Sequence, residues 1–156
     1  NDGARQQAIV EEGAALFHKA GIESQAMANV HQARWHKLVW NVPYNGLSVL
    51  LGTGTTAMMA DESSRELIQA LMVEVIKGAH ACGHEIPASY AEQMFAMTET
   101  MDDYLPSMYH DHVHKRPLEL AAIYARPLAA AKAAGCELPR MQALYQALSF
   151  IDRHNR

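Results

Sequence analysis

The chain has 156 residues, a length that fits one domain with a substantial buried core. Its 13 basic and 17 acidic residues give a formal net charge of −4, and no stretch gathers lysine and arginine into a stripe, which argues against nucleic acid or membrane partners. No apolar run reaches the roughly 20 residues that a membrane-spanning helix needs. The two cysteines, Cys82 and Cys136, form no CxxC pair. We therefore expect a soluble, cytoplasmic protein with reduced thiols.

The first part of the chain predicts two helices joined by a short segment. Apolar residues recur at helical spacing across residues 4–20, and Gly21 is a typical helix terminator. Residues 22–32 are short and fit either a strand or an extended link. The second helix covers residues 35–52, WHKLVWNVPYNGLSVLLG, and is apolar on nearly every side. A helix of that composition is expected to be buried.

The rest of the chain predicts further helices joined by short turns. Asp61 is placed to cap a helix that runs to about Cys82. The inner face of this helix is expected to comprise Leu67, Ile68, Leu71, Met72, Val75 and Ile76. The turns CGHEIP and GCELP each place a proline where the next helix begins, and helices are expected at 88–100, 106–115, 118–134 and 139–153. Because no alternating strand follows residue 33, the predicted fold class is all-α.

A narrow polar stripe crosses the apolar helix of residues 35–52. At about 100° per residue, Lys37, Asn41, Asn45 and Ser48 fall within about 80° of one another. Buried amides and ammonium groups are costly without partners, so the stripe predicts a cavity or a bound polar ligand. The alternative is that Lys37 extends to solvent and the asparagines bond to nearby backbone.

Pro43 lies between the two asparagines of this stripe. A proline inside a helix removes one backbone hydrogen bond and crowds the carbonyl four residues earlier, at a cost of roughly 3 kcal/mol unless the helix bends. A bend here would tilt Asn41 relative to Asn45, an arrangement suited to holding one small polar molecule.

Two blocks of the sequence carry a recurring pattern of polar residues. In WHKLVWNVPYNGLSVL, residues 35–50, Trp-x-Lys-Leu is followed by asparagines four and eight residues after the lysine. In LPSMYHDHVHKRPLELAAI, residues 105–123, Ser-Met-x-x-Asp is followed by arginine and by a glutamate twelve residues after the serine. Both blocks, in this order, resemble the helical C-terminal domain of ketopantoate reductases (2-dehydropantoate 2-reductases). The resemblance covers about residues 5–150 and implies the multi-helix fold of that domain and of 6-phosphogluconate dehydrogenase-like dehydrogenases.

Members of that family are two-domain enzymes, in which an N-terminal Rossmann domain holds NADPH and the helical domain holds the keto acid. This sequence has no GxGxxG after a strand, and GTGTT at residues 52–56 follows an apolar helix instead of opening one. The resemblance therefore implies that residues 1–32 are the tail of a Rossmann domain and residues 33–156 the substrate-binding and catalytic domain. The start NDGARQQ, without methionine, fits a fragment that is inactive alone.

The implied activity is the NADPH-dependent reduction of 2-dehydropantoate to pantoate in pantothenate biosynthesis. The implied partners are a small 2-oxo acid, the chain's own N-terminal Rossmann domain and a second copy in a homodimer. Two departures from the family pattern leave the identity of the keto acid open. Ala121 stands where an aspartate is common, and Thr53 to Thr56 stand where a further substrate-binding asparagine is often found. A different 2-oxo acid is therefore the alternative substrate.

Ketone reduction builds negative charge on the carbonyl oxygen, so the site needs a proton donor. Lys37 is the only ammonium on the stripe, and Glu119 is its natural counter-charge, which by resemblance also contacts the substrate. Asn41 and Asn45 are expected to hydrogen-bond the substrate. Ser107, after a proline at a helix start, could bind a carboxylate together with free backbone N–H groups. The alternatives are a helix cap for Ser107 and a first-turn carboxylate for Glu119.

The histidines support a hypothesis from another class. His80 and His84, like His110 and His114, have the i, i+4 spacing of transition-metal ligands. Gly83 is expected to end the helix before His84, and the second pair lies among charged residues typical of a solvated face, so no metal site is predicted. A non-catalytic metal-binding or dimerisation module remains the alternative to an enzyme domain.

Overall fold

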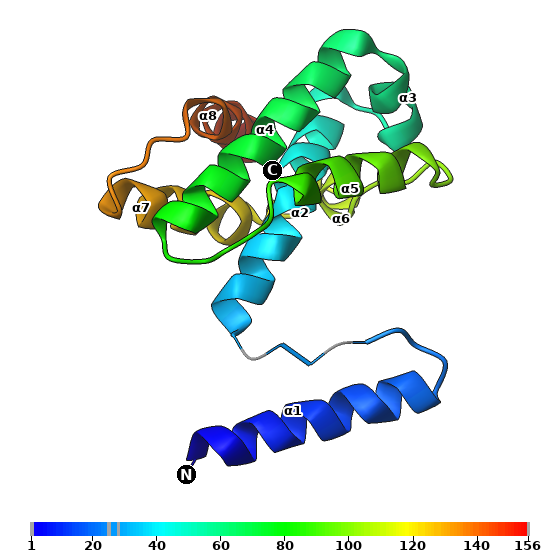
Figure 1. Ribbon diagram of the computed structural model, residues 1–156. Coiled ribbons are helices and arrows are strands. Elements are labelled where there is room, and N and C mark those ends of the chain that lie inside the picture. Colours follow the sequence, from blue (N-terminus) through cyan, green and yellow to red (C-terminus); the bar gives the residue numbers. More distant parts are fainter. Residues whose placement is uncertain (1, 25, 28, 156) are drawn as a thin grey trace. The chain divides into compact units, whose positions relative to one another are not determined.

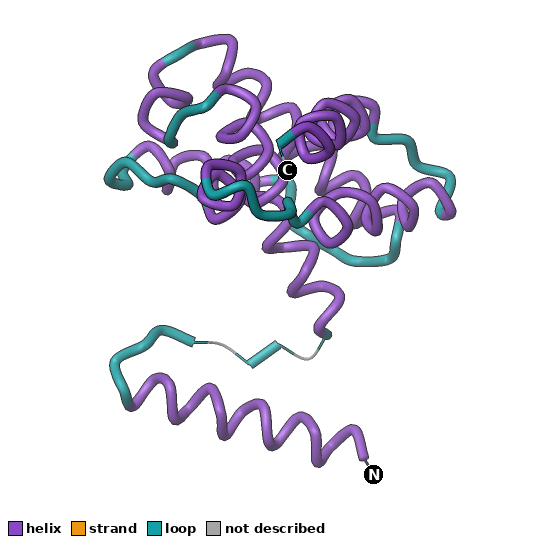
Figure 2. Tube along the Cα trace, turned by 180° about the vertical axis from the view of Figure 1, so that it is seen from behind, coloured by secondary structure: helices purple, strands orange, loops and turns teal. Residues whose placement is uncertain are grey.

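The computed structural model describes residues 2–24, 26–27 and 29–155, and within them every regular element is a helix (Figure 2). The predicted all-α fold class is therefore confirmed. Contacts divide the chain into two compact units, residues 1–33 and 34–156. Among the described residues, no helix is both long enough and apolar enough to cross a membrane.

The first unit contains α1 (Asp2–Lys19), drawn in blue in Figure 1. It ends at Gly21 as predicted: Gly21 has a φ of +78°, and the N–H of Ile22 donates to the carbonyl of Phe17 at 3.0 Å, as in a Schellman motif. Apolar side chains of α1 are exposed, among them Leu16 and Phe17. This helix therefore buries little of its apolar surface.

The link after α1 is shorter than the sequence predicts. Residues 22–29 have no regular structure where they are described, which excludes a strand there, and residues 25 and 28 lie outside the described part. The next helix begins already at Val30. The reason is a cap: the side-chain oxygen of Asn29 accepts two backbone N–H groups of the first turn, at 2.9 and 3.2 Å.

The apolar helix α2 (Val30–Leu51) runs without interruption through Pro43 and ends at Gly52, whose φ is +66°. The prediction of burial is confirmed, because every residue from Val42 to Val49 is buried. Earlier in the helix Trp35, Leu38 and Val39 are buried as well. The bend at Pro43 stays a prediction.

Helix α4 (Glu62–Ala81) has the predicted cap, because the Asp61 carboxylate accepts the N–H of Ser64 at 2.7 Å. The predicted inner face is buried except for Leu67, which is 39% exposed. Leu67 precedes Ile68 by about 100° around the helix and so lies beyond the edge of the buried arc. Figure 1 shows α3 (Thr55–Ala60) at the beginning of α4 and α7 (Arg126–Ala133) beside its last turns, and α4 packs against both.

A buried carboxylate joins α4 to the last helix, α8 (Pro139–His154). Glu74 is 6% exposed, and its two oxygens accept the backbone N–H groups of Arg140 and Met141 at 3.1 and 3.0 Å. The Arg140 guanidinium also reaches Glu74 at 3.2 Å. Glu74 thus caps a helix 66 residues away in sequence.

The sequence does not predict α3 (Thr55–Ala60), which has only six residues. Its first N–H groups are satisfied from far along the chain: the Thr55 N–H donates to the carbonyl of Tyr104 at 3.0 Å, and the Thr56 N–H to the Asp103 carboxylate at 2.9 Å. Later elements follow the predicted order: α5 (Ser89–Glu99), α6 (Ser107–Val113), η1 (Ala121–Ala125) and α7 (Arg126–Ala133). Pro139 opens α8 as predicted, whereas Pro87 precedes α5 by two residues.

The helix predicted at 118–134 is divided, because η1 is a π-helix of five residues. In it the N–H of Arg126 donates to the carbonyl of Ala121, five residues earlier. Pro127 follows immediately, and a proline ring crowds the carbonyl four residues before it. The widened turn relieves that crowding. It also rotates the side chains of α7 about the helix axis relative to those before η1.

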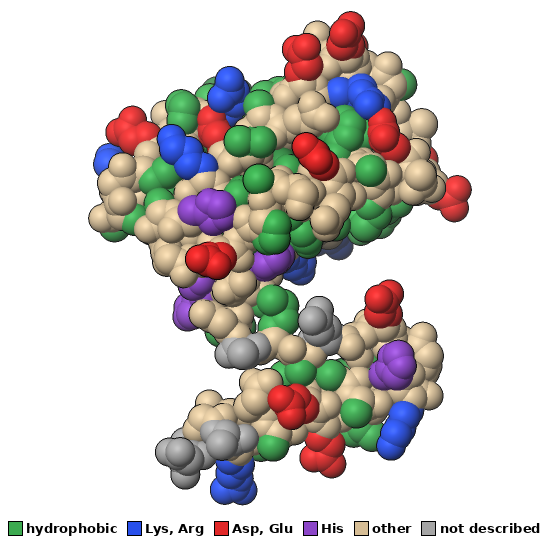
Figure 3. All heavy atoms as spheres, in the orientation of Figure 1, with side chains coloured by type: hydrophobic (Ala, Val, Ile, Leu, Met, Phe, Trp, Pro, Cys, Tyr) green, Lys and Arg blue, Asp and Glu red, His purple; other side chains and the backbone are tan. Residues whose placement is uncertain are grey.

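Side chains of both charges are interspersed on the face of residues 34–156 that Figure 3 shows. The core beneath them is one cluster, to which α2 and α4 contribute the largest share of buried apolar residues. Gly78 of α4 permits close packing there, since a Cβ at this position would lie 2.9 Å from Leu138. The polar groups that α2 carries are therefore held by a packed framework.

Candidate functional site

The polar stripe on α2 changes from exposed to buried along the helix. Lys37 is exposed, Asn41 is half-buried and Asn45 is only 3% exposed. The expectation that Lys37 lies on a buried seam is therefore wrong for this chain. Its position precedes the continuous buried segment of α2, which starts at Val42.

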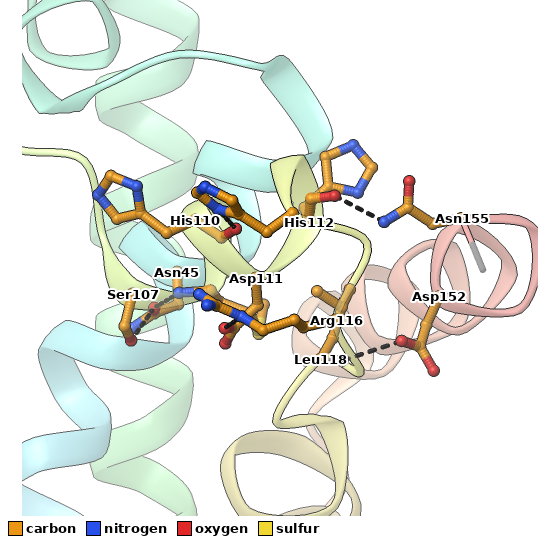
Figure 4. A network of polar contacts seen from close by, with 11 residues as sticks. Asn45, Ser107, His110, Asp111, His112, Arg116, Leu118, Asp152 and Asn155 are labelled. Carbon is orange, nitrogen blue, oxygen red and sulfur yellow. Dashed lines mark hydrogen bonds and ion pairs between the residues drawn. The ribbon is translucent and has the colours of Figure 1, made fainter.

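Asn45 of α2 contacts the beginning of α6, which brings together two predicted site residues 62 positions apart (Figure 4). The Asn45 side-chain oxygen accepts the Met108 N–H at 3.1 Å and the Ser107 hydroxyl at 3.4 Å. The expectation of free N–H groups at this helix start is wrong for two residues, because the Tyr109 N–H also donates, to the Pro106 carbonyl at 3.0 Å. Ser107 does not cap the helix either; Pro106 occupies the cap position.

The segment after α6 is fixed to its surroundings at several points that Figure 4 shows. Arg116 donates to Asp111 at 2.8 Å, and the Leu118 N–H donates to Asp152 of α8 at 2.9 Å. Asn155 adds a bond from the chain's end to the carbonyl of His112 at 2.7 Å. These contacts set the path of the chain just before Glu119.

Glu119 is exposed, and its carbonyl accepts the N–H of Ile123 at 3.1 Å where η1 begins. Within the described residues, neither Lys37 nor Glu119 takes part in an ion pair. The structure thus brings Asn45 and Ser107 together but does not pair the predicted proton donor with its predicted counter-charge.

An aromatic group that no sequence pattern predicted lies beside the stripe. Trp40 stacks on Tyr44, with ring centroids 4.7 Å apart, and contacts the Tyr104 ring at 5.9 Å. The Trp40 indole N–H is held by Thr98 at 3.0 Å. Tyr104, 44% exposed, lies three residues before Ser107, so this short stretch contacts α2 at Trp40 and again at Asn45.

A second missed residue is Tyr124, whose fully buried hydroxyl donates to the Val42 carbonyl at 2.7 Å. Burial raises the pKa of this hydroxyl far above its ordinary value, so it stays protonated and donates across the working pH range. The close approach requires a glycine opposite, because a Cβ on Gly46 would lie 2.3 Å from the Tyr124 oxygen. No periodicity in the sequence indicates this contact.

The histidine pairs make local contacts. His80 Nε2 lies 2.7 Å from the Ile86 carbonyl, and His114 Nδ1 lies 2.7 Å from the carbonyl of His110. Gly83 has a φ of +78° and ends α4 before His84, as predicted. The described part of the chain contains no group of three or more His, Cys, Asp or Glu residues that could hold a metal ion.

The glycine-containing loop at residues 52–56 does not fit a dinucleotide phosphate. A phosphate-binding loop presents free backbone N–H groups at a helix start. Here the N–H groups of Thr55 and Thr56 are already bonded, to Tyr104 and Asp103. The Asp103 carboxylate at this position would also repel a phosphate.

Comparison with known proteins gives one consistent family. Residues 29–152 match the family described as ketopantoate reductase PanE/ApbA C terminal. A 2-dehydropantoate 2-reductase of Nostoc sp. is 44% identical over 140 residues, which are 90% of this chain and 44% of that protein.

Solved structures agree. The 2-dehydropantoate 2-reductase of Geobacter metallireducens is 40% identical with a TM-score of 0.86, covering 92% of this chain and 48% of that one. The dimeric ketopantoate reductase of Staphylococcus aureus is 26% identical with a TM-score of 0.78, covering 86% and 48%. The chain thus spans less than half the length of these relatives. The resemblance in the two sequence blocks is confirmed, and the chain belongs to the ketopantoate reductase family, as its C-terminal domain.

Proposed function

We propose that the chain is the C-terminal domain of an NADPH-dependent reductase that converts 2-dehydropantoate to pantoate in pantothenate biosynthesis. One observation carries the proposal. The two sequence blocks that define the resemblance meet in space, through the hydrogen bonds of Asn45 on α2 with Ser107 and Met108 on α6. This contact occurs in a chain that is 44% identical to a 2-dehydropantoate 2-reductase.

In this proposal Lys37 donates the proton that the reduced carbonyl oxygen requires. Its exposure leaves the ammonium accessible to a substrate on the open side of α2. Glu119 supplies the opposing charge and a contact to the substrate. Asn41, half-buried next along the stripe, offers its amide group. Asn45 offers its NH₂ group, since its oxygen is bonded to α6, and the Ser107 hydroxyl binds the carboxylate of the 2-oxo acid.

The cofactor is assigned to a separate N-terminal Rossmann domain, of which residues 1–32 form the tail. Two features support this assignment. The loop at residues 52–56 does not fit a dinucleotide phosphate, as its N–H groups are used within the chain. The apolar side chains of α1, such as Leu16 at 61% and Phe17 at 57% exposure, offer a face for another domain. A cytoplasmic location and a homodimer complete the proposal; a dimeric relative supports the latter.

The test uses the longer protein that joins this chain to its N-terminal domain. Oxidation of NADPH is followed with 2-dehydropantoate and a panel of other 2-oxo acids. Lys37→Ala should lower kcat by roughly 10²-fold or more, because a general acid is lost. The matched control is Lys132→Ala, which removes an exposed lysine from α7 and should leave kcat unchanged.

The 156-residue chain alone is expected to be inactive with NADPH. Turnover by this chain alone would contradict the assignment of the cofactor to another domain. A Lys37→Ala enzyme with full kcat would instead contradict the role of Lys37 and favour a non-catalytic helical module.

A different 2-oxo acid is the second candidate, and one contact favours it. Thr55 lies in the stretch where the family often carries a further substrate-binding asparagine. Its side chain is 1% exposed, and its hydroxyl accepts the Tyr104 N–H at 2.9 Å. This hydroxyl is occupied within the protein, so it offers no replacement for the missing amide. A higher kcat/KM for another acid of the panel would establish this candidate.

A further inference from the structure

Tyr124 connects the two segments that carry the proposed proton donor and its counter-charge. It lies on η1, which begins two residues after Glu119 and is attached to it by the Ile123 N–H bond to the Glu119 carbonyl at 3.1 Å. At its other end, the Tyr124 hydroxyl donates to the carbonyl of Val42 at 2.7 Å. Val42 follows Asn41 on α2, so one side chain joins the Glu119 segment to the polar stripe.

The hydroxyl also interacts with the backbone of α2 at a second point. Gly46 lies directly against the hydroxyl, because a Cβ added to Gly46 would overlap the Tyr124 oxygen. Val42 and Gly46 are four residues apart, so the hydroxyl contacts both ends of one helical rung. The preceding turn lacks one backbone bond, from residue 43 to the Val39 carbonyl, because Pro43 has no N–H. Tyr124 therefore holds the backbone of α2 next to this gap, between the two asparagines of the stripe.

The position of the hydroxyl is closely restricted. A Cβ on Gly46 would lie 2.3 Å from the Tyr124 oxygen and 2.7 Å from the side chain of Leu144. On its other side, the Tyr124 ring stacks on Tyr145, with centroids 6.3 Å apart and planes inclined by 17°. The π-turn of η1 sets the register that directs Tyr124 into this space.

We infer that Tyr124 is a positioning residue, whose hydroxyl fixes the α2 segment between Asn41 and Asn45 relative to the segment that begins at Glu119. The inference rests on the proposed function for its effect on turnover. Its structural part, the control of the stripe geometry, concerns this chain alone.

The decisive variant is Tyr124→Phe, which keeps the ring and removes only the hydroxyl. In the longer enzyme, kcat with the 2-oxo acid should fall about 10- to 100-fold, since small misplacements of binding groups reduce turnover on this scale. The KM for NADPH should stay unchanged. Tyr145→Phe makes the same chemical change on the stacked neighbour and should leave kcat and both KM values unchanged.

A second measurement uses the 156-residue chain. The NMR signals of the Asn41 and Asn45 side-chain amides should shift in Tyr124→Phe and not in Tyr145→Phe. If the wild-type enzyme reduces no 2-oxo acid, the proposed function fails, and the amide signals alone decide the positioning role. If the enzyme is active while Tyr124→Phe keeps its kcat and its amide signals, the inference is overturned.

Should Tyr124→Phe fail to fold, Gly46→Ala takes its place. This variant keeps the hydroxyl but displaces it, because the added Cβ and the oxygen cannot both remain at 2.3 Å. It should lower kcat in the same way, and a Gly46→Ala enzyme with unchanged kcat would overturn the inference.

Discussion

The two units of this chain differ in the exposure of their apolar side chains. In α1, Leu16 follows a helical apolar pattern and is 61% exposed, whereas Leu71 of α4 follows a similar pattern and is 1% exposed. Helical periodicity tells which side of a helix is apolar, but it does not tell what covers that side. The comparison separates apolar residues that are buried within residues 34–156 from apolar residues of α1 that are exposed in the described part of the chain.

The largest expected contrast comes from truncating these two leucines. Leu71→Ala should lower the free energy of unfolding of residues 34–156 by about 2–5 kcal/mol, because it leaves a cavity in the core. Leu16→Ala should change it by less than about 0.5 kcal/mol. Denaturant unfolding followed by tryptophan fluorescence measures this unit alone, since Trp35 and Trp40 both belong to it. Equal losses in the two variants would remove the distinction between the units.

A smaller contrast with opposite signs is expected from two helical glycines. Gly46→Ala should lower the free energy of unfolding of residues 34–156 by about 1–3 kcal/mol, because the new methyl group overlaps Tyr124 and Leu144. Gly13→Ala should stabilise α1 by up to about 1 kcal/mol, since nothing lies within 4 Å of the added atom and alanine favours helix. Hydrogen exchange of the α1 amides measures the stabilisation of α1 by Gly13→Ala. Denaturant unfolding measures the first effect, and an unchanged or higher free energy of unfolding in Gly46→Ala would contradict the close contact of Gly46 with Tyr124 and Leu144.

The smallest contrast is a pH dependence confined to the second unit, since all six tyrosines lie beyond residue 33. Burial raises the pKa of Tyr44, Tyr90 and Tyr124 above the ordinary value near 10. A group whose pKa is raised on folding contributes stability that is present below its unfolded pKa and lost as pH rises through the folded one. The free energy of unfolding should therefore fall above about pH 10, by roughly 1.4 kcal/mol per pH unit from Tyr124.

Unfolding curves recorded between pH 8 and pH 11 check this pH dependence. Tyr124→Phe should show a shallower loss than the wild type above pH 10, whereas the helicity of α1 should not follow the tyrosine titration. If the free energy of unfolding of the wild type does not change over this pH range, Tyr124 does not titrate on unfolding, and the prediction is wrong.

Features set by neighbouring residues could be predicted from the sequence, and features set by distant contacts could not. The cap at Asp61, the stop at Gly21 and the burial of α2 depend on local patterns and are confirmed. Helix α3 escapes prediction because its first N–H groups bond to residues 47 and 49 positions away. The π-turn of η1 was not predicted either, because a single widened turn leaves the spacing of apolar residues almost unchanged.

In the candidate site, too, local spacing could be read from the sequence and long-range contacts could not. The spacing of Lys37, Asn41 and Asn45 indicated one face of α2, and the family resemblance pointed to Ser107. The contact of Ser107 with Asn45 depends on the docking of two helices, which spacing alone does not reveal. Lys37 was expected to be buried because its neighbours are apolar, but burial at one position depends on what packs above it. Tyr124 acts through a single hydroxyl on a distant backbone and leaves no pattern in the sequence.

The connections of α6 have a consequence for the order of folding. This helix of seven residues is too short to be stable by itself. It is bonded to Asn45 of α2, 62 residues away. The chain around it is bonded to Asp152 of α8 and to Asn155 just after α8, over 34 and 43 residues. Such long loops close slowly, since their entropy must be lost before the contacts form. We therefore expect α6, with Ser107, to become ordered only after α2 and α8 are in place.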